Sequence, residues 1–157
     1  MGIEIERKFL VKNDAWRTGT PTLYVQGYLN PDKNRTVRVR IAETKAMITV
    51  KGITTGPSRA EYEYPIPLED AQNMLKLCKG PLIEKHRWFY RAGDLTWEID
   101  EFFGPNAGLI VAEIELDHED QNVDLPDWVG REVTDDNRYF NSSLSVTPFT
   151  TWAKVPG

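Results

Sequence analysis

Alternation of apolar and polar residues with a period of two recurs along most of the chain and constrains the fold more than any other feature. This period is typical of β-strands that present one apolar and one polar face. Turn-forming residues such as Asn30-Pro31-Asp32 and Arg91-Ala92-Gly93-Asp94 separate the alternating runs. The pattern predicts eight strands, over residues 3–11, 22–29, 35–42, 46–51, 59–66, 82–90, 95–103 and 109–116.

Only short helices are expected beside these strands. Apolar residues recur at three- and four-residue spacing between Leu68 and Cys78, which predicts a helix over 68–78. The acidic stretch 118–126 is expected to hold a short helical turn, and Asn141-Ser142-Ser143 is expected to cap a short C-terminal helix. The chain is therefore expected to be an antiparallel-rich α+β protein that forms a single domain over residues 1–157.

The polar faces of seven of the eight predicted strands carry charged residues, mostly as pairs of like sign. Like charges side by side repel, mildly in water and strongly in a cavity, so they need compensation. The acidic residues on these faces are Glu4, Glu6, Glu61, Glu63, Glu98, Asp100, Glu113 and Glu115. The basic residues on these faces are Lys8, Arg38, Arg40, Lys51, Lys85 and Arg87.

Three arrangements remain open from this pattern alone. An ordinary antiparallel sheet would expose the polar faces to solvent. A barrel closed with its apolar face inside would form a hydrophobic cup, whereas the opposite closure would form a hydrated, charged tunnel that is open at both ends. A charged tunnel needs charged occupants, because carboxylates bind divalent cations while Lys and Arg bind phosphates. The pattern therefore raises the hypothesis of a metal–polyphosphate site.

Composition excludes several other classes of protein. The chain has 157 residues, with 19 Lys and Arg against 24 Asp and Glu, so its formal net charge is −5. This balance argues against a general nucleic-acid binder and against a basic membrane-surface protein. Cys78 is the single cysteine, so neither an intramolecular disulfide nor a cysteine-based zinc site is expected. Because no signal peptide and no long apolar run is found, a cytoplasmic location is expected.

The charged pairs also occur in the order of a known family. The segment Glu4-Ile5-Glu6-Arg7-Lys8 resembles the ExExK signature of the CYTH superfamily, the triphosphate tunnel metalloenzymes, and lies at the N-terminus as it does there. The resemblance covers essentially the whole chain. The motifs that follow in family order are Arg38-Val39-Arg40, Ile48-Thr49-Val50-Lys51, Glu61-Tyr62-Glu63, Glu84-Lys85-His86-Arg87, Trp97-Glu98-Ile99-Asp100, Glu113-Ile114-Glu115 and Glu132-Val133-Thr134.

The resemblance implies an eight-stranded antiparallel β-barrel whose tunnel holds a triphosphate together with Mg²⁺ or Mn²⁺. The metal ligands that it implies are Glu4, Glu6 and Glu115. It places Glu113 and Asp100 either among the ligands or beside them. The phosphate-binding residues that it implies are Lys8, Arg38, Arg40, Lys51, Lys85 and Arg87. Glu61 and Glu63 are expected to bind a second metal ion or to orient the attacking water.

Three further residues each have two interpretations. Tyr28 shares a strand face with Gln26. It either reaches the tunnel, where it hydrogen-bonds Lys8 or a phosphate as a catalytic residue, or spans core and surface. Arg138 either closes over the substrate and binds its phosphates or forms a structural ion pair. Arg59 lines a tunnel mouth or is a surface arginine.

The activity that the resemblance implies is metal-assisted hydrolysis of inorganic tripolyphosphate to pyrophosphate and phosphate, by water attack inside the tunnel. A class IV adenylyl cyclase and a thiamine triphosphatase are alternatives on the same fold. A non-catalytic module that binds polyphosphate or nucleotide is the alternative of another class. The expected partner is a small triphosphate rather than a nucleic acid or a membrane, and the sequence leaves open whether the chain forms a homodimer.

Overall fold

The computed structural model describes residues 2–152 of the chain. All eight predicted strands are present, within a residue or two of their expected ends, together with a short ninth strand. The strands are β1 (Ile3–Val11), β2 (Thr22–Asn30), β3 (Arg35–Ala42), β4 (Lys45–Gly52), β5 (Ser58–Ile66), β6 (Ile83–Ala92), β7 (Leu95–Phe102), β8 (Ile110–Glu115) and β9 (Val129–Glu132). The helices are α1 (Leu68–Leu75) and α2 (Asn141–Leu144), with short 3₁₀ turns η1 (Gly104–Asn106), η2 (Asn137–Tyr139) and η3 (Phe149–Thr151).

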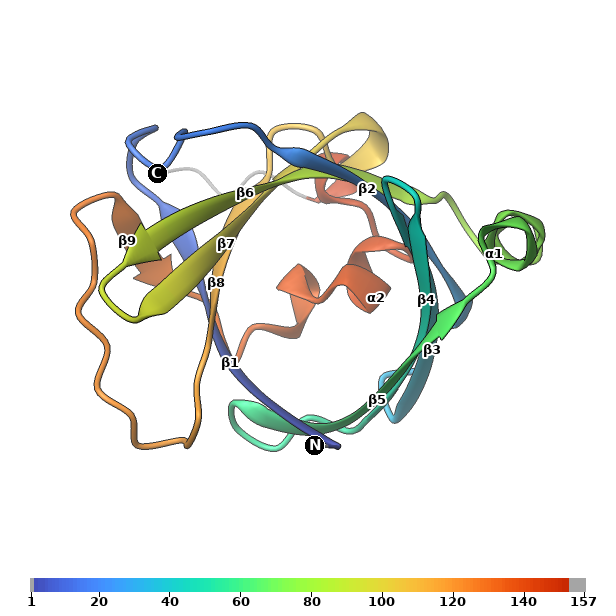
Figure 1. Ribbon diagram of the computed structural model, residues 1–157, viewed down its shortest axis with the longest axis horizontal. Helices are drawn as coiled ribbons and strands as arrows, with labels where there is room; N and C mark the ends of the chain where they lie inside the picture. Colours follow the sequence, from blue (N-terminus) through green and yellow to red (C-terminus); the bar gives the residue numbers. More distant parts are fainter. Residues whose placement is uncertain (1, 153–157) are drawn as a thin grey trace.

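Strands β1 to β8 close into an antiparallel barrel, so the expected fold is confirmed. Neighbouring strands follow the order β5-β4-β3-β2-β6-β7-β8-β1, and a further pairing of β5 with β1 closes the ring, as Figure 1 shows. One edge of β1 pairs with β5 at Ile3–Ile5 and, further along, with β9 at Phe9 and Val11. The ninth strand therefore extends one wall of the barrel rather than adding a position to the ring.

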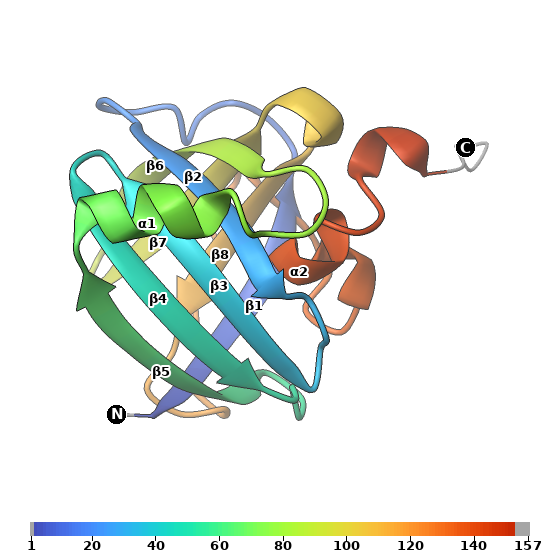
Figure 2. The same ribbon diagram turned by 90° about the vertical axis from the view of Figure 1, so that its right-hand side faces the viewer.

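The charged face of the strands points into the barrel and the apolar face points outward. The outer face carries two clusters of buried side chains. One is rich in aromatic residues and includes Phe9, Trp16, Trp97 and Trp128. In the other, Ala71 of α1 packs on Val39 and Ala46, where α1 lies across the outside of the sheet (Figure 2). Burial of apolar surface outside the barrel thus leaves its interior free for polar groups.

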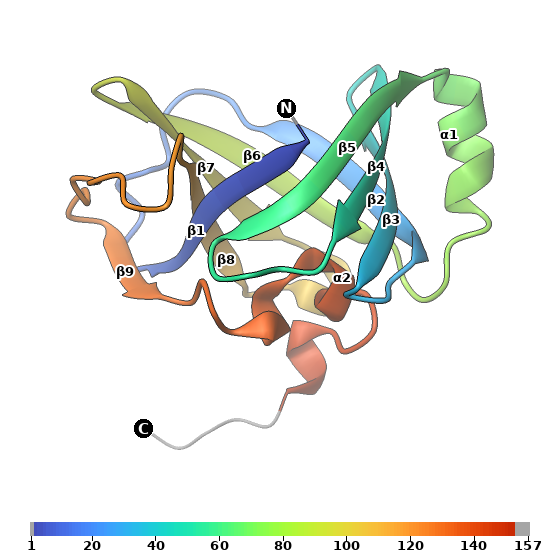
Figure 3. The ribbon, with the colours of Figure 1, turned by 90° about the horizontal axis from the view of Figure 1, so that it is seen from below.

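The tunnel is closed at one end, so the expectation that it is open at both ends is wrong. Figure 3 shows α2 at one end of the barrel, opposite the start of β1. Leu144 of α2 and Tyr139 of η2 pack there against Ile83, Phe102 and Val111. These three residues share the inward register of the charged residues on β6, β7 and β8, but they are apolar. They therefore require an apolar partner, which the C-terminal segment supplies.

The predicted helices differ from the observed ones in three places. Helix α1 ends at Leu75 rather than Cys78, because the backbone of residues 76–78 forms bonds three residues back instead of four. Residues 118–126 hold a turn, with Gln121 N bonded to His118 O, and no helix. Helix α2 begins after Phe140, with no side-chain cap. No helix in residues 2–152 is long and apolar enough to cross a membrane.

Candidate active site

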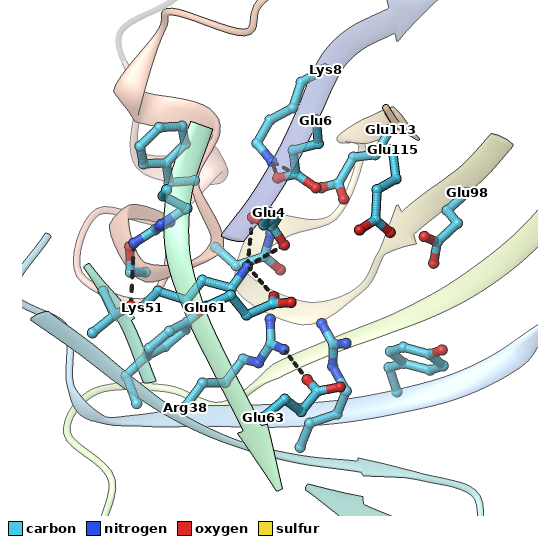
Figure 4. Close-up of a pocket in the computed structure, with 18 of the residues that line it drawn as sticks. Glu4, Glu6, Lys8, Arg38, Lys51, Glu61, Glu63, Glu98, Glu113 and Glu115 are labelled. Atoms are coloured by element: carbon cyan, nitrogen blue, oxygen red, sulfur yellow. Dashed lines mark hydrogen bonds and ion pairs between the residues drawn. The ribbon is translucent and has the colours of Figure 1, made fainter. Parts of the chain in front are cut away.

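A polar cavity of about 290 Å³ occupies the interior of the barrel. It is lined by side chains from all eight barrel strands and by the start of α2; Figure 4 shows many of these side chains. Most of the predicted site residues meet there, whereas Asp100 and Arg138 do not line it. The predicted residues on its wall are Glu4, Glu6, Lys8, Tyr28, Arg38, Arg40, Lys51, Glu61, Glu63, Lys85, Arg87, Glu113 and Glu115.

Two lysines neutralise the acidic wall of the cavity. Lys51 Nζ lies 2.9 Å from Glu4 Oε2 and 3.4 Å from Glu61 Oε2, and Figure 4 shows it between these carboxylates. Lys8 Nζ pairs with Glu6 and lies 3.2 Å from Glu113 Oε1. Burial alone would lower the pKa of Lys8, but the carboxylates of Glu113 and Glu6 outweigh burial and raise it. These carboxylates therefore favour the charged form of Lys8.

Arg38 is held on the opposite wall by a hydroxyl and a carboxylate. Its Nη2 donates to Thr49 Oγ1 at 3.1 Å and to Glu63 Oε2 at 3.3 Å, while the Thr49 hydroxyl donates to the same oxygen of Glu63 at 2.7 Å. Arg38 Nε is buried and has no hydrogen-bond partner among the described residues. A buried guanidinium donor without an acceptor is costly, so this position favours an anionic ligand.

Asp100 lies behind the basic wall rather than on the cavity surface. It is fully buried, and its oxygens accept hydrogen bonds from Lys85 Nζ at 2.7 Å and from Arg87 Nε at 2.8 Å and Nη2 at 3.0 Å. Burial alone would raise the pKa of Asp100, but Arg87 and Lys85 outweigh burial and lower it. A carboxylate engaged in this way holds two cations in place, and of the two expectations for Asp100, a metal ligand or a residue beside the metal ion, this position favours the second.

Two cations of the basic wall have lowered pKa values. Burial lowers the pKa of Arg40 to about 9, and the neighbouring charges of Arg38 and Arg87 add to the effect. Its Nε donates to the neutral Gln26 Oε1 at 2.8 Å, and no carboxylate among the described residues forms a salt bridge with it. Burial likewise lowers the pKa of Lys85 to about 7, which Asp100 only partly offsets. Both cations would gain from a nearby anion.

Carboxylates gather on β1, β7 and β8, where Figure 4 shows Glu4, Glu6, Glu98, Glu113 and Glu115 facing the cavity. Burial raises the pKa of Glu115, and the charges of Glu4 and Glu98 raise it further. A cation placed among these side chains would relieve that repulsion, and hard oxygen donors suit Mg²⁺ or Mn²⁺. The donor set therefore fits a divalent metal ion. Within residues 2–152, however, no three such side chains converge tightly enough to hold one as they stand, since lysines lie between them.

Arg138 lies outside the cavity. Its Nη2 pairs with Asp136 Oδ2 at 2.7 Å, and its guanidinium lies 4.9 Å from the ring centroid of Trp152. The interpretation as a structural ion pair therefore agrees with its position, while the phosphate-binding role does not. Tyr28 does line the cavity, yet it packs in the apolar cluster of the closed end, and no hydrogen bond joins it to Lys8 among the described residues.

Several lining residues were not among the predicted site residues. Arg59, weighed above as a surface arginine, lines the cavity and donates to Gly52 O at 3.0 Å from Nη2. Arg59 lies two residues before Glu61 and therefore on the same face of the strand, so the alternation in the sequence could have identified it as a cavity residue. Phe140 and Asn141 also line the cavity, but they lie outside the barrel strands, so no strand pattern could have indicated them.

Comparisons with known proteins agree with this architecture. An inorganic triphosphatase of Acetivibrio thermocellus is 50% identical over 151 residues, which are 95% of this chain and 97% of that protein. An inorganic triphosphatase of Nitrosomonas europaea is 35% identical over 150 residues, covering 92% of this chain and 97% of that protein. A crystal structure of an inorganic triphosphatase has a TM-score of 0.65 at 31% identity and covers 98% of this chain and 99% of that one. The CYTH domain pattern matches residues 2–148, and the chain belongs to the CYTH domain family.

Proposed function

We propose that this protein hydrolyses inorganic tripolyphosphate to pyrophosphate and phosphate with the help of a divalent metal ion. The observation that carries the proposal is a cavity, closed at one end, whose wall combines seven basic side chains with a cluster of carboxylates. A metal-complexed polyphosphate satisfies both sets of charges at once. The similarity to inorganic triphosphatases over almost the whole chain supports the same substrate class.

The size and lining of the cavity favour an inorganic substrate over a nucleotide or thiamine derivative. At about 290 Å³, the cavity is at the lower end of the range for small-molecule sites. Two of its aromatic side chains, those of Tyr24 and Phe140, already face cations. Arg40 and Arg87 lie 4.8 and 4.7 Å from the ring of Tyr24. Lys8 and Arg59 each lie 5.7 Å from the ring of Phe140. Neither ring is therefore free to stack on an organic base.

We assign the metal ion to Glu4, Glu6 and Glu115, with Glu113 beside them. When bound, Mg²⁺ or Mn²⁺ would neutralise phosphate charge and lower the pKa of a coordinated water. Lys8 and Lys51 now pair with these carboxylates and with Glu61. On substrate binding, we expect both lysines to turn to phosphate oxygens, which releases the carboxylates for the metal ion. Asp100 keeps Lys85 and Arg87 in place throughout.

The chain's own residues also account for the transfer step. Arg38, Arg40, Lys85 and Arg87 bind phosphate oxygens, and a phosphate beside Lys85 would favour its charged form. A water oxygen attacks the terminal phosphorus, the bond to the bridging oxygen breaks, pyrophosphate leaves, and the proton of the water passes to the carboxylate that orients it. We propose that the carboxylates of Glu61 and Glu63 orient this water. The positive charge of Lys8 stabilises the negative charge that develops on the phosphate oxygens.

Phosphate release from tripolyphosphate, ATP and thiamine triphosphate tests the proposal. Each substrate is incubated with Mg²⁺, with Mn²⁺ or with EDTA, and cyclic AMP is measured in the ATP samples. We expect metal-dependent release that is fastest on tripolyphosphate. Cyclic AMP production, or a preference for thiamine triphosphate, would replace the proposed activity with another on the same fold. Binding of tripolyphosphate without turnover would make the protein a binding module.

The remaining properties stay predictions from the sequence. Four of them each need their own measurement: a single domain over residues 1–157, a cytoplasmic location, the absence of a nucleic-acid or membrane partner, and the formation of a homodimer. Sedimentation of the purified protein would decide between monomer and homodimer.

A further inference from the structure

A row of hydrogen-bonded side chains connects α2 to the basic wall of the cavity. Asn141 Oδ1, on the first residue of α2, accepts a hydrogen bond from Lys85 Nζ at 2.9 Å and one from Gln26 Nε2 at 3.0 Å. Gln26 Oε1 in turn accepts from Arg40 Nε at 2.8 Å. Two neutral amides thus join a helix at the closed end of the barrel to cations on β6 and β3. Figure 1 shows α2 inside the ring of strands that carries them.

The Arg40 guanidinium, at one end of this row, determines which group donates and which accepts in every hydrogen bond of the row. Arg40 Nε can only donate, so Gln26 must present its oxygen to Arg40 and its NH₂ group to Asn141. Asn141 must then present its oxygen to Gln26, and the same oxygen is available to Lys85. A reversed amide at either position would place two donors or two acceptors against each other. The row therefore has a single satisfied arrangement.

Neutral amides suit this position better than carboxylates. Gln26 is completely buried, so its hydrogen bonds are made in a low-dielectric environment where they restrict side-chain motion effectively. A carboxylate in its place would cancel the charge of Arg40, as Glu4 does for Lys51. An amide orients the guanidinium without neutralising its positive charge, which can then attract an anionic ligand.

We propose that Gln26 and Asn141 are positioning residues, through which α2 orients Arg40 and Lys85 for phosphate binding. This inference rests on the proposed function, because it assumes that both cations bind phosphate. Helix α2 then has a role beyond closing the barrel. It contributes the acceptor that aligns two strands' cations toward one substrate.

The single variants Gln26→Ala and Asn141→Ala test the inference. Each should lower kcat/KM for tripolyphosphate by about 10- to 100-fold, since a misplacement of about 1 Å can cost 100-fold. The matched control is Ser143→Ala, on the same turn of α2, whose side chain neither lines the cavity nor forms a hydrogen bond among the described residues. The control should retain wild-type kinetics. Wild-type kinetics in both single variants would overturn the inference.

Double variants separate positioning from a general structural role. If Gln26 acts only through Arg40, adding Gln26→Ala to Arg40→Ala should cause no further loss of kcat/KM. Asn141→Ala added to Lys85→Ala should cause a smaller loss than Asn141→Ala causes in the wild-type protein, because only the branch through Gln26 to Arg40 then remains. Multiplicative losses in both pairs, with unchanged melting temperatures, would overturn the inference.

The affinity for tripolyphosphate, measured by calorimetry, distinguishes this inference from the proposed function. If the wild-type protein binds tripolyphosphate but does not hydrolyse it, the proposed function fails, and the same variants are compared by affinity. The inference then requires weaker binding in the two single variants, no added effect of Gln26→Ala in Arg40→Ala, and a reduced effect of Asn141→Ala in Lys85→Ala. Absence of tripolyphosphate binding by the wild-type protein would overturn both.

Discussion

At the scale of single residues, compensation between opposite charges explains why so many ionised groups can share one cavity. Like-signed neighbours on a strand face, such as Glu4 and Glu6, would repel strongly at low dielectric. Each meets a lysine instead: Lys51 pairs with Glu4, and Lys8 pairs with Glu6. Removing one partner would leave the other charge buried and unpaired, so individual substitutions should have large effects.

Glu4→Gln and Glu6→Gln should each lower metal-dependent phosphate release by about 100-fold, because a bound metal ion supplies several kcal/mol of charge stabilisation. The measurement is kcat/KM over a Mg²⁺ titration. Glu69→Gln, at an exposed site on α1, is the control with the same change of charge and should behave as wild type. Undiminished activity of Glu4→Gln and Glu6→Gln would remove both residues from the metal site.

Arg40→Lys should raise KM for tripolyphosphate by about tenfold, even though the positive charge remains. Lysine lacks the guanidinium Nε that bonds Gln26, and a hydrogen bond to a charged group contributes about 1.5–3 kcal/mol. Arg35→Lys, at the exposed start of β3, is the control. An unchanged KM in Arg40→Lys would show that charge alone matters at this position.

At the scale of elements, short segments outside the ring complete the barrel. Helix α2 fills the closed end with Leu144, which is fully buried against the apolar cluster of Tyr28 and Ile83. Strand β9 extends the wall beside β1, where Arg7 donates to Glu132 from Nε at 2.9 Å and from Nη2 at 2.8 Å. The packing of α2 and the pairing of β9 thus both join the C-terminal part of the chain to strands that come much earlier in the sequence.

Leu144→Ala should lower the free energy of unfolding by about 2–5 kcal/mol, the usual cost of deleting a large buried aliphatic side chain. Urea unfolding followed by tryptophan fluorescence measures it. Leu77→Ala is the matched control, because Leu77 is 72% exposed and should cost little. Equal stability of the two variants would mean that Leu144 does not anchor α2.

The pairing of β9 with β1 should contribute to stability in a pH-dependent way. The hydrogen bonds from Arg7 lower the pKa of Glu132 from its usual 4.5. A carboxyl group whose pKa is lower in the folded state stabilises that state above the unfolded-state pKa, and this contribution is lost as pH falls through the folded-state pKa. Glu132→Gln should therefore be less stable than wild type at pH about 7, and the difference should shrink below pH about 4. A constant difference in urea midpoints across this range would contradict the assignment.

At the scale of the whole molecule, the barrel reverses the usual arrangement of core and surface. Apolar side chains pack outside the ring beneath α1 and the long loops, while the interior is charged. Such an interior is only partly satisfied by its own ion pairs, as the buried and unpartnered Arg38 Nε indicates. A ligand that supplies the missing charges should therefore stabilise the fold as well as react in it.

Tripolyphosphate and Mg²⁺ together should raise the melting temperature more than either does alone. Ligand at about 100 times its Kd adds about 2.7 kcal/mol to the free energy of unfolding. Differential scanning fluorimetry with each component, with both, and with EDTA added afterwards measures the effect. Equal shifts with and without Mg²⁺ would argue against joint binding of metal ion and phosphate.

The sequence alone determined the strands, the sign of the charge at each inward position, and most of the cavity wall. Period-two alternation is a local consequence of strand geometry, so Glu113 and Glu115 must share a face opposite Ile114 in any fold that keeps the strand. The resemblance to the family added the closure of those strands into a barrel with the charged face inside. Only the tertiary structure decided which end of the tunnel is closed, why Asp100 lies behind Lys85, and where Arg138 points.

The contact between Gln26 and Asn141 shows the physical reason for this division. These residues are 115 positions apart, and neither strand alternation nor a helical period relates them. Their meeting depends on the stagger of the strands around the ring and on the packing of Leu144 into the closed end. Local patterns determine the direction in which a side chain points, whereas the partner that it meets is set by packing across the whole barrel.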